Sequence, residues 1–189
     1  MRRLTYFVAS TLDGFIAGPD GSWDFFPIEG EHEAGIAARY PESIPTHVRS
    51  AIGVDPENSS LDAVVMGRMT YQPALDIGVT SPYAHLRQYV VSRTLGASED
   101  PAVEVISDDP LGRIQKLKTE PGKGIWLCGG GNLAHQLLGE IDELVLKLYP
   151  IVIGSGIPLF AGDFGPHFFT LADRTVYGNG VALLTYRPS

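Results

Sequence analysis

The chain has 189 residues and a net charge of −8, from 22 acidic against 14 basic side chains. Apolar residues make up 44% and charged residues 19%, which excludes global disorder, because disorder requires low hydrophobicity and high charge. The acidic balance argues against a broad basic face for duplex DNA, and no run approaches the ~20 apolar residues of a membrane span. We therefore expect one domain over residues 1–189, located in the cytoplasm.

The cysteine and histidine content does not indicate a disulfide or a metal site. The single cysteine, Cys128, cannot form an intrachain disulfide and is best explained as a small buried apolar side chain. The five histidines lack the spacing of zinc ligands, so we expect them to occupy surface or packing positions and predict no metal site. The glutamates at 29, 31 and 33 are expected to be solvated.

The N-terminal third predicts one buried strand, a long loop and two helices. In chain order these are a strand over 4–10, a loop over 19–32, helices over 34–40 and 44–52, and a polar loop over 54–60. The loop over 19–32 combines glycines with Trp23, Phe25 and Phe26, which predicts a segment that covers the active site. The second helix has an apolar stripe made of Ile44, Val48, Ala51 and Ile52.

The rest of the chain alternates strands with helices. Strands are expected over 61–66, 88–91, 103–106, 125–128 and 143–152, helices over 70–77, 110–120 and 131–138, and a terminal hairpin over 176–177 and 181–186. Pro150 marks a bulge or an edge position in its strand. The alternation predicts an α/β fold, with a mixed, mostly parallel sheet flanked by helices and a C-terminal antiparallel hairpin at its edge.

Ligands of such sheets bind at the carboxyl ends of the strands, so the residues that follow each strand are the candidates for a binding site. Gly67, Arg68 and Thr70 follow one strand at a helix start, where free N–H groups and the helix dipole favour an anion. Ser92 and Arg93 follow another strand with a second hydroxyl and guanidinium. The alternative at both places is an ordinary polar turn.

Three consecutive glycines, Gly129, Gly130 and Gly131, follow the strand over 125–128, and Asn132 comes directly after them. A strand, glycines and then a helix is the geometry that cradles a pyrophosphate, although a tight turn with close helix packing is the alternative. Three anion sites at three strand ends predict an extended dinucleotide. Two arginines for one ligand favour NADPH over NADH.

Five segments in register resemble the dihydrofolate reductase-like family, and within it the reductase domain of the bifunctional deaminase-reductase of the riboflavin pathway. These segments are residues 10–17, 65–71, 89–93, 126–131 and 142–160. The resemblance implies a reductase that uses NADPH. It implies that Ala9, Ile16 and Ala17 surround the nicotinamide, that Gly67, Arg68 and Thr70 bind the adenosine-side phosphate, that Ser92 and Arg93 bind the 2′-phosphate, and that Gly130, Gly131, Asn132 and Leu133 form the pyrophosphate turn.

The expected reaction is hydride transfer from NADPH to a small heterocyclic or sugar-like substrate, and the resemblance implies an activity similar to 5-amino-6-(5-phosphoribosylamino)uracil reductase. Asp13 and Asp24 are the candidate catalytic residues for proton delivery. Against these roles, Asp13 could cap its own turn, Asp24 could be solvated, and a water could supply the proton. Dihydrofolate reduction and a non-catalytic nucleotide-binding module remain alternative functions. The apolar run 144–153, together with family analogy, predicts a homodimer.

Overall fold

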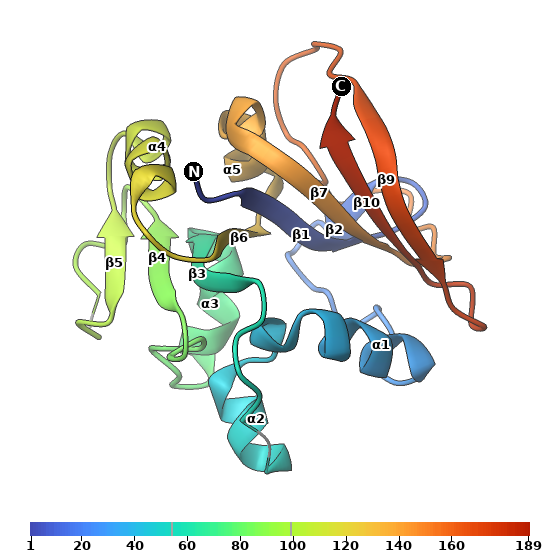
Figure 1. Cartoon of the computed structure of the whole chain (residues 1–189), viewed down its shortest axis with the longest axis horizontal. Helices are drawn as coiled ribbons and strands as arrows, with labels where there is room; N and C mark the ends of the chain where they lie inside the picture. Colours follow the sequence, from blue (N-terminus) through green and yellow to red (C-terminus); the bar gives the residue numbers. More distant parts are fainter. Residues whose placement is uncertain (54, 99) are drawn as a thin grey trace.

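An eight-stranded sheet runs through the centre of the molecule in the order β5-β4-β3-β6-β1-β7-β10-β9 (Figure 1). This computed structural model describes residues 1–53, 55–98 and 100–189. Its strands are β1 (Leu4–Ser10), β3 (Leu61–Gly67), β4 (Arg87–Val91), β5 (Val103–Ile106), β6 (Gly124–Gly129), β7 (Ile141–Leu148), β9 (Phe169–Val176) and β10 (Ala182–Pro188). The strands from β5 to β7 are parallel, and β10 is antiparallel to both of its neighbours. The α/β fold class with an antiparallel C-terminal edge is confirmed.

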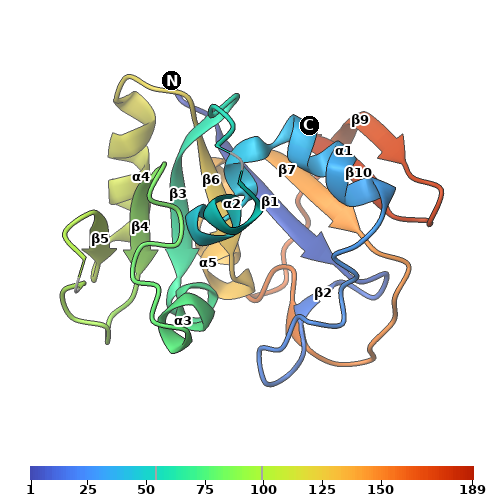
Figure 2. The same ribbon diagram turned by 90° about the horizontal axis from the view of Figure 1, so that it is seen from below.

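Helices cover both faces of this sheet, as the two perpendicular views in Figures 1 and 2 show. The helices on one side are α1 (Glu31–Arg39), α2 (Thr46–Ile52) and α3 (Arg68–Asp76), and those on the other are α4 (Pro110–Thr119) and α5 (Gly131–Gln136). Short 3-10 turns occupy Pro41–Ser43 and Leu138–Glu140. The expected cap of α4 is present, because the carboxylate of Asp109 accepts a hydrogen bond of 2.9 Å from the amide of Gly112.

Successive residues of each strand point to opposite faces, so the central strands are apolar throughout and the core has two layers. In β1, Tyr6 packs toward α4 and α5, whereas Phe7 packs toward α1 and α3. Both side chains are almost completely buried. The strand predicted over 4–10 is therefore confirmed as a buried central strand.

Two short strands were not anticipated from the sequence. β2 (Phe15–Ala17) and β8 (Ile157–Pro158) pair antiparallel as a separate two-stranded sheet beside β1. Each is too short for a periodic signal, because a pattern of alternate burial needs at least four residues to be read. Together they place the segment after β1 against the segment after β7.

The strand predicted over 143–152 is wrong at its end, because β7 stops at Leu148 and Pro150 lies outside the sheet. The chain turns away there, and the amide of Leu12 bonds to the carbonyl of Ile151 at 2.8 Å. The strand β7 lies between β1 and β10, so burial inside the sheet explains its apolar run. The first hairpin strand, expected over 176–177, is longer than predicted and begins at Phe169.

The helix expected over 34–40 begins earlier, at Glu31, and so takes the end of the predicted loop. The stripe predicted to bury the second helix is also wrong, because Val48 and Ile52 are exposed. Arg49 is the buried residue of α2, and it donates to the carbonyls of Ile44, Pro56 and Pro41. Backbone acceptors therefore orient this helix. The loop predicted over 54–60 starts at a position outside the described residues.

Candidate functional site

Most of the predicted cofactor residues lie in one row at the carboxyl ends of β4, β3, β6 and β1, and the neighbouring strand β7 extends this row. Gly67 at the end of β3 pairs with Val91 of β4, so Arg68 and Ser92 leave the sheet side by side. On the other side of β3, Met66 pairs with Gly129 of β6. The next strand is β1, and its Ala9 pairs with Lys147 of β7.

Neighbouring strands lie about 4.8 Å apart, so the four intervals from β4 to β7 span roughly 19 Å. The row therefore begins with Ser92 and Arg93, directly after β4, and ends with Lys147 on β7. The polar groups that the sequence placed at separate strand ends form one continuous edge.

The glycine turn after β6 forms the middle of this row. The peptide bond between Gly129 and Gly130 is cis. A Cβ atom added to Gly130 would meet nothing closer than Ile16 Cδ1 and Thr70 Oγ1, both at 3.9 Å. Gly130 therefore lies between a residue assigned to the nicotinamide and a residue assigned to a phosphate.

The close approach of three backbones explains why neighbouring positions are glycine. A Cβ on Gly67 would lie 3.3 Å from the amide nitrogen of Gly130, and a Cβ on Gly131 would lie 2.1 Å from the carbonyl oxygen of Pro158. The first helix turn of α5 is thus pressed against β8. Leu133 is buried beneath it, while Asn132 is exposed and accepts a hydrogen bond of 2.6 Å from Gln136.

The two arginines of the row differ in their surroundings. Arg68 is partly buried, and its Nη1 atom is buried without a hydrogen-bond partner among the residues that the structure describes. A buried guanidinium nitrogen with no partner is costly, so a bound anion is the group that would satisfy it. Arg93 is exposed, and the hydroxyl of the buried Ser92 accepts bonds from the amides of Thr94 and Leu95. An unpaired guanidinium nitrogen beside an open glycine turn fits a dinucleotide phosphate.

The nicotinamide-side residues come from β1 and β2. Ala9 and Ile16 are partly buried and Ala17 is buried. Ala17 pairs with Ile157 of β8, and a Cβ on Gly156 would lie 2.2 Å from the carbonyl oxygen of Ala17. The surface formed by these apolar side chains is therefore fixed by the pairing of β2 with β8, and it is the wall of the candidate nicotinamide site.

Asp13 holds the same two segments together. Its carboxylate accepts hydrogen bonds from the Thr11 hydroxyl at 2.6 Å and from the amides of Ile153 and Gly154 at 3.1 and 2.7 Å. These donors, the Thr11 hydroxyl first, hold the pKa of Asp13 below its ordinary value. An ionised carboxylate with three donors is suited to fixing a loop, and proton delivery by Asp13 stays a prediction.

Asp24 is exposed in the segment that precedes α1, and its catalytic role also stays a prediction. The aromatic side chains of that segment divide into two sets. Phe26 is buried against Phe25 and Tyr149, with ring centroids 4.6 and 4.9 Å apart. Trp23 is 52% exposed. Part of the segment therefore closes the core, and Trp23 remains free to meet a ligand.

Lys147 is a polar residue of this edge that the sequence reasoning missed. Its ammonium nitrogen lies 5.0 Å from the centre of the Phe7 ring. Burial lowers the pKa of Lys147, whereas the Glu33 carboxylate and Cys128 act in the opposite direction. A lysine inside the apolar run over 144–153 is the signal that could have revealed it.

Glu33, which the sequence assigned to solvent, faces the site from the first turn of α1. The hydroxyl of Tyr149 donates to its carboxylate at 3.3 Å, and Nε2 of His32 lies 3.4 Å from the same oxygen. His32 is fully buried, as expected for a packing residue. Cys128 is partly buried against the core, and its surroundings raise the pKa of the thiol to about 12, so this side chain is neutral near the site.

A cavity of about 410 Å³ lies elsewhere, at the amino ends of the strands, with Arg2, Arg3, Arg39 and Lys123 in its lining. It takes no part in the row of strand ends. Within residues 1–53, 55–98 and 100–189, no cluster of side chains could hold a metal ion. Across that same part of the chain, no helix is long and apolar enough to cross a membrane.

The sheet order and the glycine turn at its centre define a dihydrofolate reductase-like α/β domain. The chain belongs to the RibD C-terminal domain family, whose sequence profile matches residues 2–183. It is 32% identical over 162 residues to the uncharacterized protein YwjB of Bacillus subtilis (strain 168), covering 84% of this chain and 83% of YwjB.

Solved structures share the fold across the whole chain. A protein from Shewanella sp. PV-4 that has been assigned to riboflavin biosynthesis is similar, with a TM-score of 0.72 and 24% identity, covering 100% of this chain and 99% of that one. A diaminohydroxyphosphoribosylaminopyrimidine deaminase/5-amino-6-(5-phosphoribosylamino)uracil reductase from Thermotoga maritima has a TM-score of 0.66 and 16% identity, covering 100% of this chain and 57% of that one.

Dihydrofolate reductase from Enterococcus faecalis, complexed with NADP(H), has a TM-score of 0.66 and 12% identity, covering 99% of this chain and 96% of that one. At these identities the likeness is one of fold. Together with the family, these neighbours support a reductase.

Proposed function

We propose that this protein is an NADPH-dependent oxidoreductase that transfers a hydride to a small heterocyclic or sugar-like substrate, and that its activity is most similar to that of 5-amino-6-(5-phosphoribosylamino)uracil reductase. The single observation that carries the proposal is the row of strand ends from Arg93 to Lys147. Guanidinium and hydroxyl groups suited to binding phosphate lie at one end of this row, the open glycine turn forms its middle, and small apolar side chains lie next to Lys147.

Bound NADPH would supply the hydride. Arg93 and Ser92 would bind its 2′-phosphate, and Arg68, Thr70 and the glycine turn would hold the remaining phosphates. Ala9, Ile16 and Ala17 would contact the nicotinamide and exclude water from it. The protein's share of the chemistry is to orient the cofactor, position the substrate and deliver a proton.

The test is the loss of NADPH absorbance when the purified protein is mixed with candidate substrates. The panel contains 5-amino-6-(5-phosphoribosylamino)uracil, dihydrofolate, other pterins and quinones. Turnover of the aminouracil supports the proposal. Turnover of dihydrofolate alone supports the alternative that rests on the fold shared with dihydrofolate reductase. NADPH binding without turnover of any substrate supports a non-catalytic module.

The homodimer expected from the sequence is also part of the proposal, and the edge strand β9 is its most suitable surface. Residues 170–176 of this strand are exposed, and Phe164 and Phe168 are 101% and 75% exposed beside it. An exposed edge strand with apolar neighbours favours pairing with another chain. Sedimentation should give about twice 20.4 kDa, and a 20.4 kDa particle at micromolar concentration would contradict the dimer.

A further inference from the structure

The last position of the row, beyond the nicotinamide residues, is occupied by Lys147. The pairing of Lys147 with Ala9 puts the two residues side by side on adjacent strands. Val145, two residues earlier in β7, packs with Phe7 on the face covered by α1, and Lys147 shares that face because strand side chains alternate. Its ammonium accordingly lies over the Phe7 ring at 5.0 Å. The lysine is therefore next to the place where hydride would leave the cofactor.

The contact with the Phe7 ring leaves the N–H donors of this ammonium unused. Among the described residues it makes neither a hydrogen bond nor an ion pair. The titratable groups that face it are Glu33 from α1 and Cys128 from β6. Because the thiol is neutral, Glu33 is the group among these that can stabilise the charged lysine. A charged donor that the fold leaves unpaired is available to a substrate.

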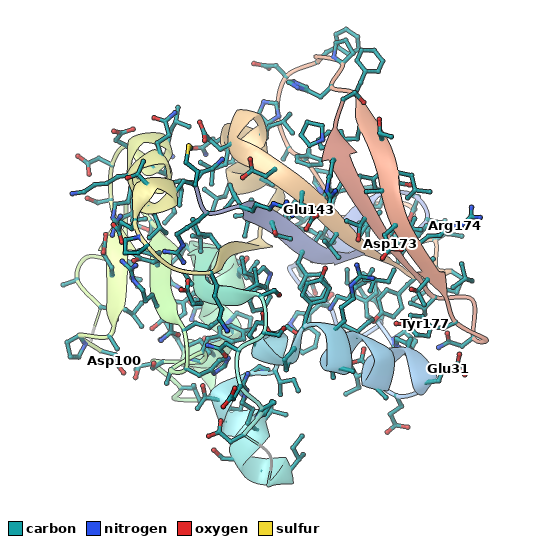
Figure 3. The ribbon with its side chains drawn as sticks, in the orientation of Figure 1. Glu31, Asp100, Glu143, Asp173, Arg174 and Tyr177 are labelled. Atoms are coloured by element: carbon teal, nitrogen blue, oxygen red, sulfur yellow. The ribbon has the colours of Figure 1, made fainter. Side chains whose placement is uncertain are left out.

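Glu33 is fixed in place by a network around the first turn of α1. Tyr149 donates to its carboxylate, and the neighbouring His32 is held by Asn179 at 2.8 Å and by the carbonyl of Pro27 at 3.2 Å. The amide of Gly178 donates a hydrogen bond of 2.9 Å to the Glu31 carboxylate, so the turn between β9 and β10 is bonded to the first turn of α1. Figure 3 labels Glu31 and Tyr177 at this junction. The distance between Glu33 and the sheet is thus set by the C-terminal hairpin.

We propose that Lys147 is the proton donor of the reduction and that Glu33 is the positioning residue that keeps it charged. The assignment rests on the proposed function. As hydride reaches the carbon of a C=O or C=N bond, the π electron pair moves to the heteroatom, which takes a proton from the Lys147 ammonium. The product gains one hydride and one proton, NADPH becomes NADP⁺, and the neutral amine is reprotonated from water. Cys128, whose pKa burial raises to about 12, is a weaker acid than the Lys147 ammonium, whose pKa burial lowers, and Ala9 has no side-chain proton to give.

The charge state of Lys147 can be measured without turnover. The chain has four lysines, so reductive methylation with ¹³C-formaldehyde gives few lysine signals for an NMR titration of the whole protein. Lys147→Met identifies the signal, and the exposed Lys116 provides the reference. We expect the pKa of Lys147 to lie below the ordinary value for lysine and Glu33→Gln to lower that pKa further. A pKa of Lys147 at the ordinary value for lysine, or no response to Glu33→Gln, would overturn the assignment.

Activity provides the second measurement, on the panel substrate that wild type turns over. Lys147→Met should lower kcat by about 100-fold or more, the size of a lost general acid, while NADPH binding measured by fluorescence stays nearly unchanged. Glu33→Gln should move the alkaline limb of the kcat/KM profile to lower pH, which a merely structural role would not do. Lys116→Met should behave as wild type.

The outcomes separate the two proposals. No turnover by wild type removes the proposed function and this assignment with it. Turnover by wild type with equal turnover by Lys147→Met removes the assignment alone.

Discussion

The carboxylate of Asp13 lies 2.7 Å from the amide nitrogen of Gly154, which fastens the segment after β1 to the segment after β7. We expect Asp13→Ala to lower thermal stability and to raise KM for the cofactor, because β2 and β8 form the wall at Ala17. The folded-state pKa of Asp13 lies below its ordinary value of 3.8. Its contribution to stability is therefore complete above that value and is lost as pH falls through the folded-state pKa.

Thermal unfolding at several pH values checks this prediction, with the exposed Asp24→Ala as the matched variant. The gap between wild type and Asp13→Ala should be constant near neutral pH and close in strong acid. A gap that persists unchanged at the lowest pH would show that the carboxylate charge has no part in it.

Arg93→Ala should weaken NADPH binding and leave NADH binding almost unchanged. A charge-assisted hydrogen bond to the 2′-phosphate contributes ~1.5–3 kcal/mol in a partly desolvated site, which corresponds to roughly 10- to 150-fold in KM. Added salt should weaken NADPH binding more than NADH binding, because Arg93 is exposed and its interaction is screened.

The control for that variant is Arg174→Ala, on the opposite edge strand, where Figure 3 labels it. Equal loss of both cofactors in Arg93→Ala would assign Arg93 to structure or to the pyrophosphate. Equal use of NADH and NADPH by wild type would refute the preference inferred from two arginines.

Gly131→Ala should destabilise the protein by roughly 1–3 kcal/mol or more, the range of an overpacked core. The added Cβ would lie 2.1 Å from the backbone oxygen of Pro158, and a backbone oxygen cannot swing aside as a flexible side chain can. Gly139→Ala is the matched variant, because a Cβ there meets nothing within 4 Å. Urea unfolding of both variants tests the difference, and equal stabilities would contradict the close approach of α5 to β8.

NADPH should quench the emission of Trp23, which is 52% exposed and precedes the anchored Phe25 and Phe26. The signal is the difference between wild type and Trp23→Phe, because the second tryptophan, Trp126, is buried. Adenosine 2′,5′-bisphosphate, which lacks nicotinamide, should quench it much less. Equal quenching by both ligands would mean that residues 19–30 do not cover the nicotinamide.

The sequence was sufficient for the fold class and for predicting that the candidate phosphate-binding residues lie at one edge of the sheet. Gly67, Arg68, Ser92 and the three glycines follow strands that were recognisable from apolar runs, and parallel strands bring their carboxyl ends to one edge. That rule converts local signals into a spatial prediction without knowledge of the strand order. The pairing of Gly67 with Val91 and of Met66 with Gly129 then supplies the order.

The β7 end of the row, where we propose that the substrate binds, could not be predicted in the same way. Glu33 belongs to α1, and only the packing of α1 on the sheet and its hydrogen bond from Gly178 bring its carboxylate toward Lys147. The apolar stripe of α2 failed for a related reason, since the backbone acceptors of Arg49 oriented the helix against its hydrophobic period. Contacts between distant segments decided both positions.

The central place of β1 in the sheet also governs how the protein folds. Leu4 pairs with Ile125 and with Ile141, so the middle of the row forms only after very distant parts of the chain have met. Such long-range parallel pairing makes folding slow compared with helical proteins of similar size. A chain still being synthesised lacks the complete row of strand ends until β7 has emerged. A nucleotide that binds only the completed sheet would stabilise the native state and slow unfolding, without increasing the folding rate.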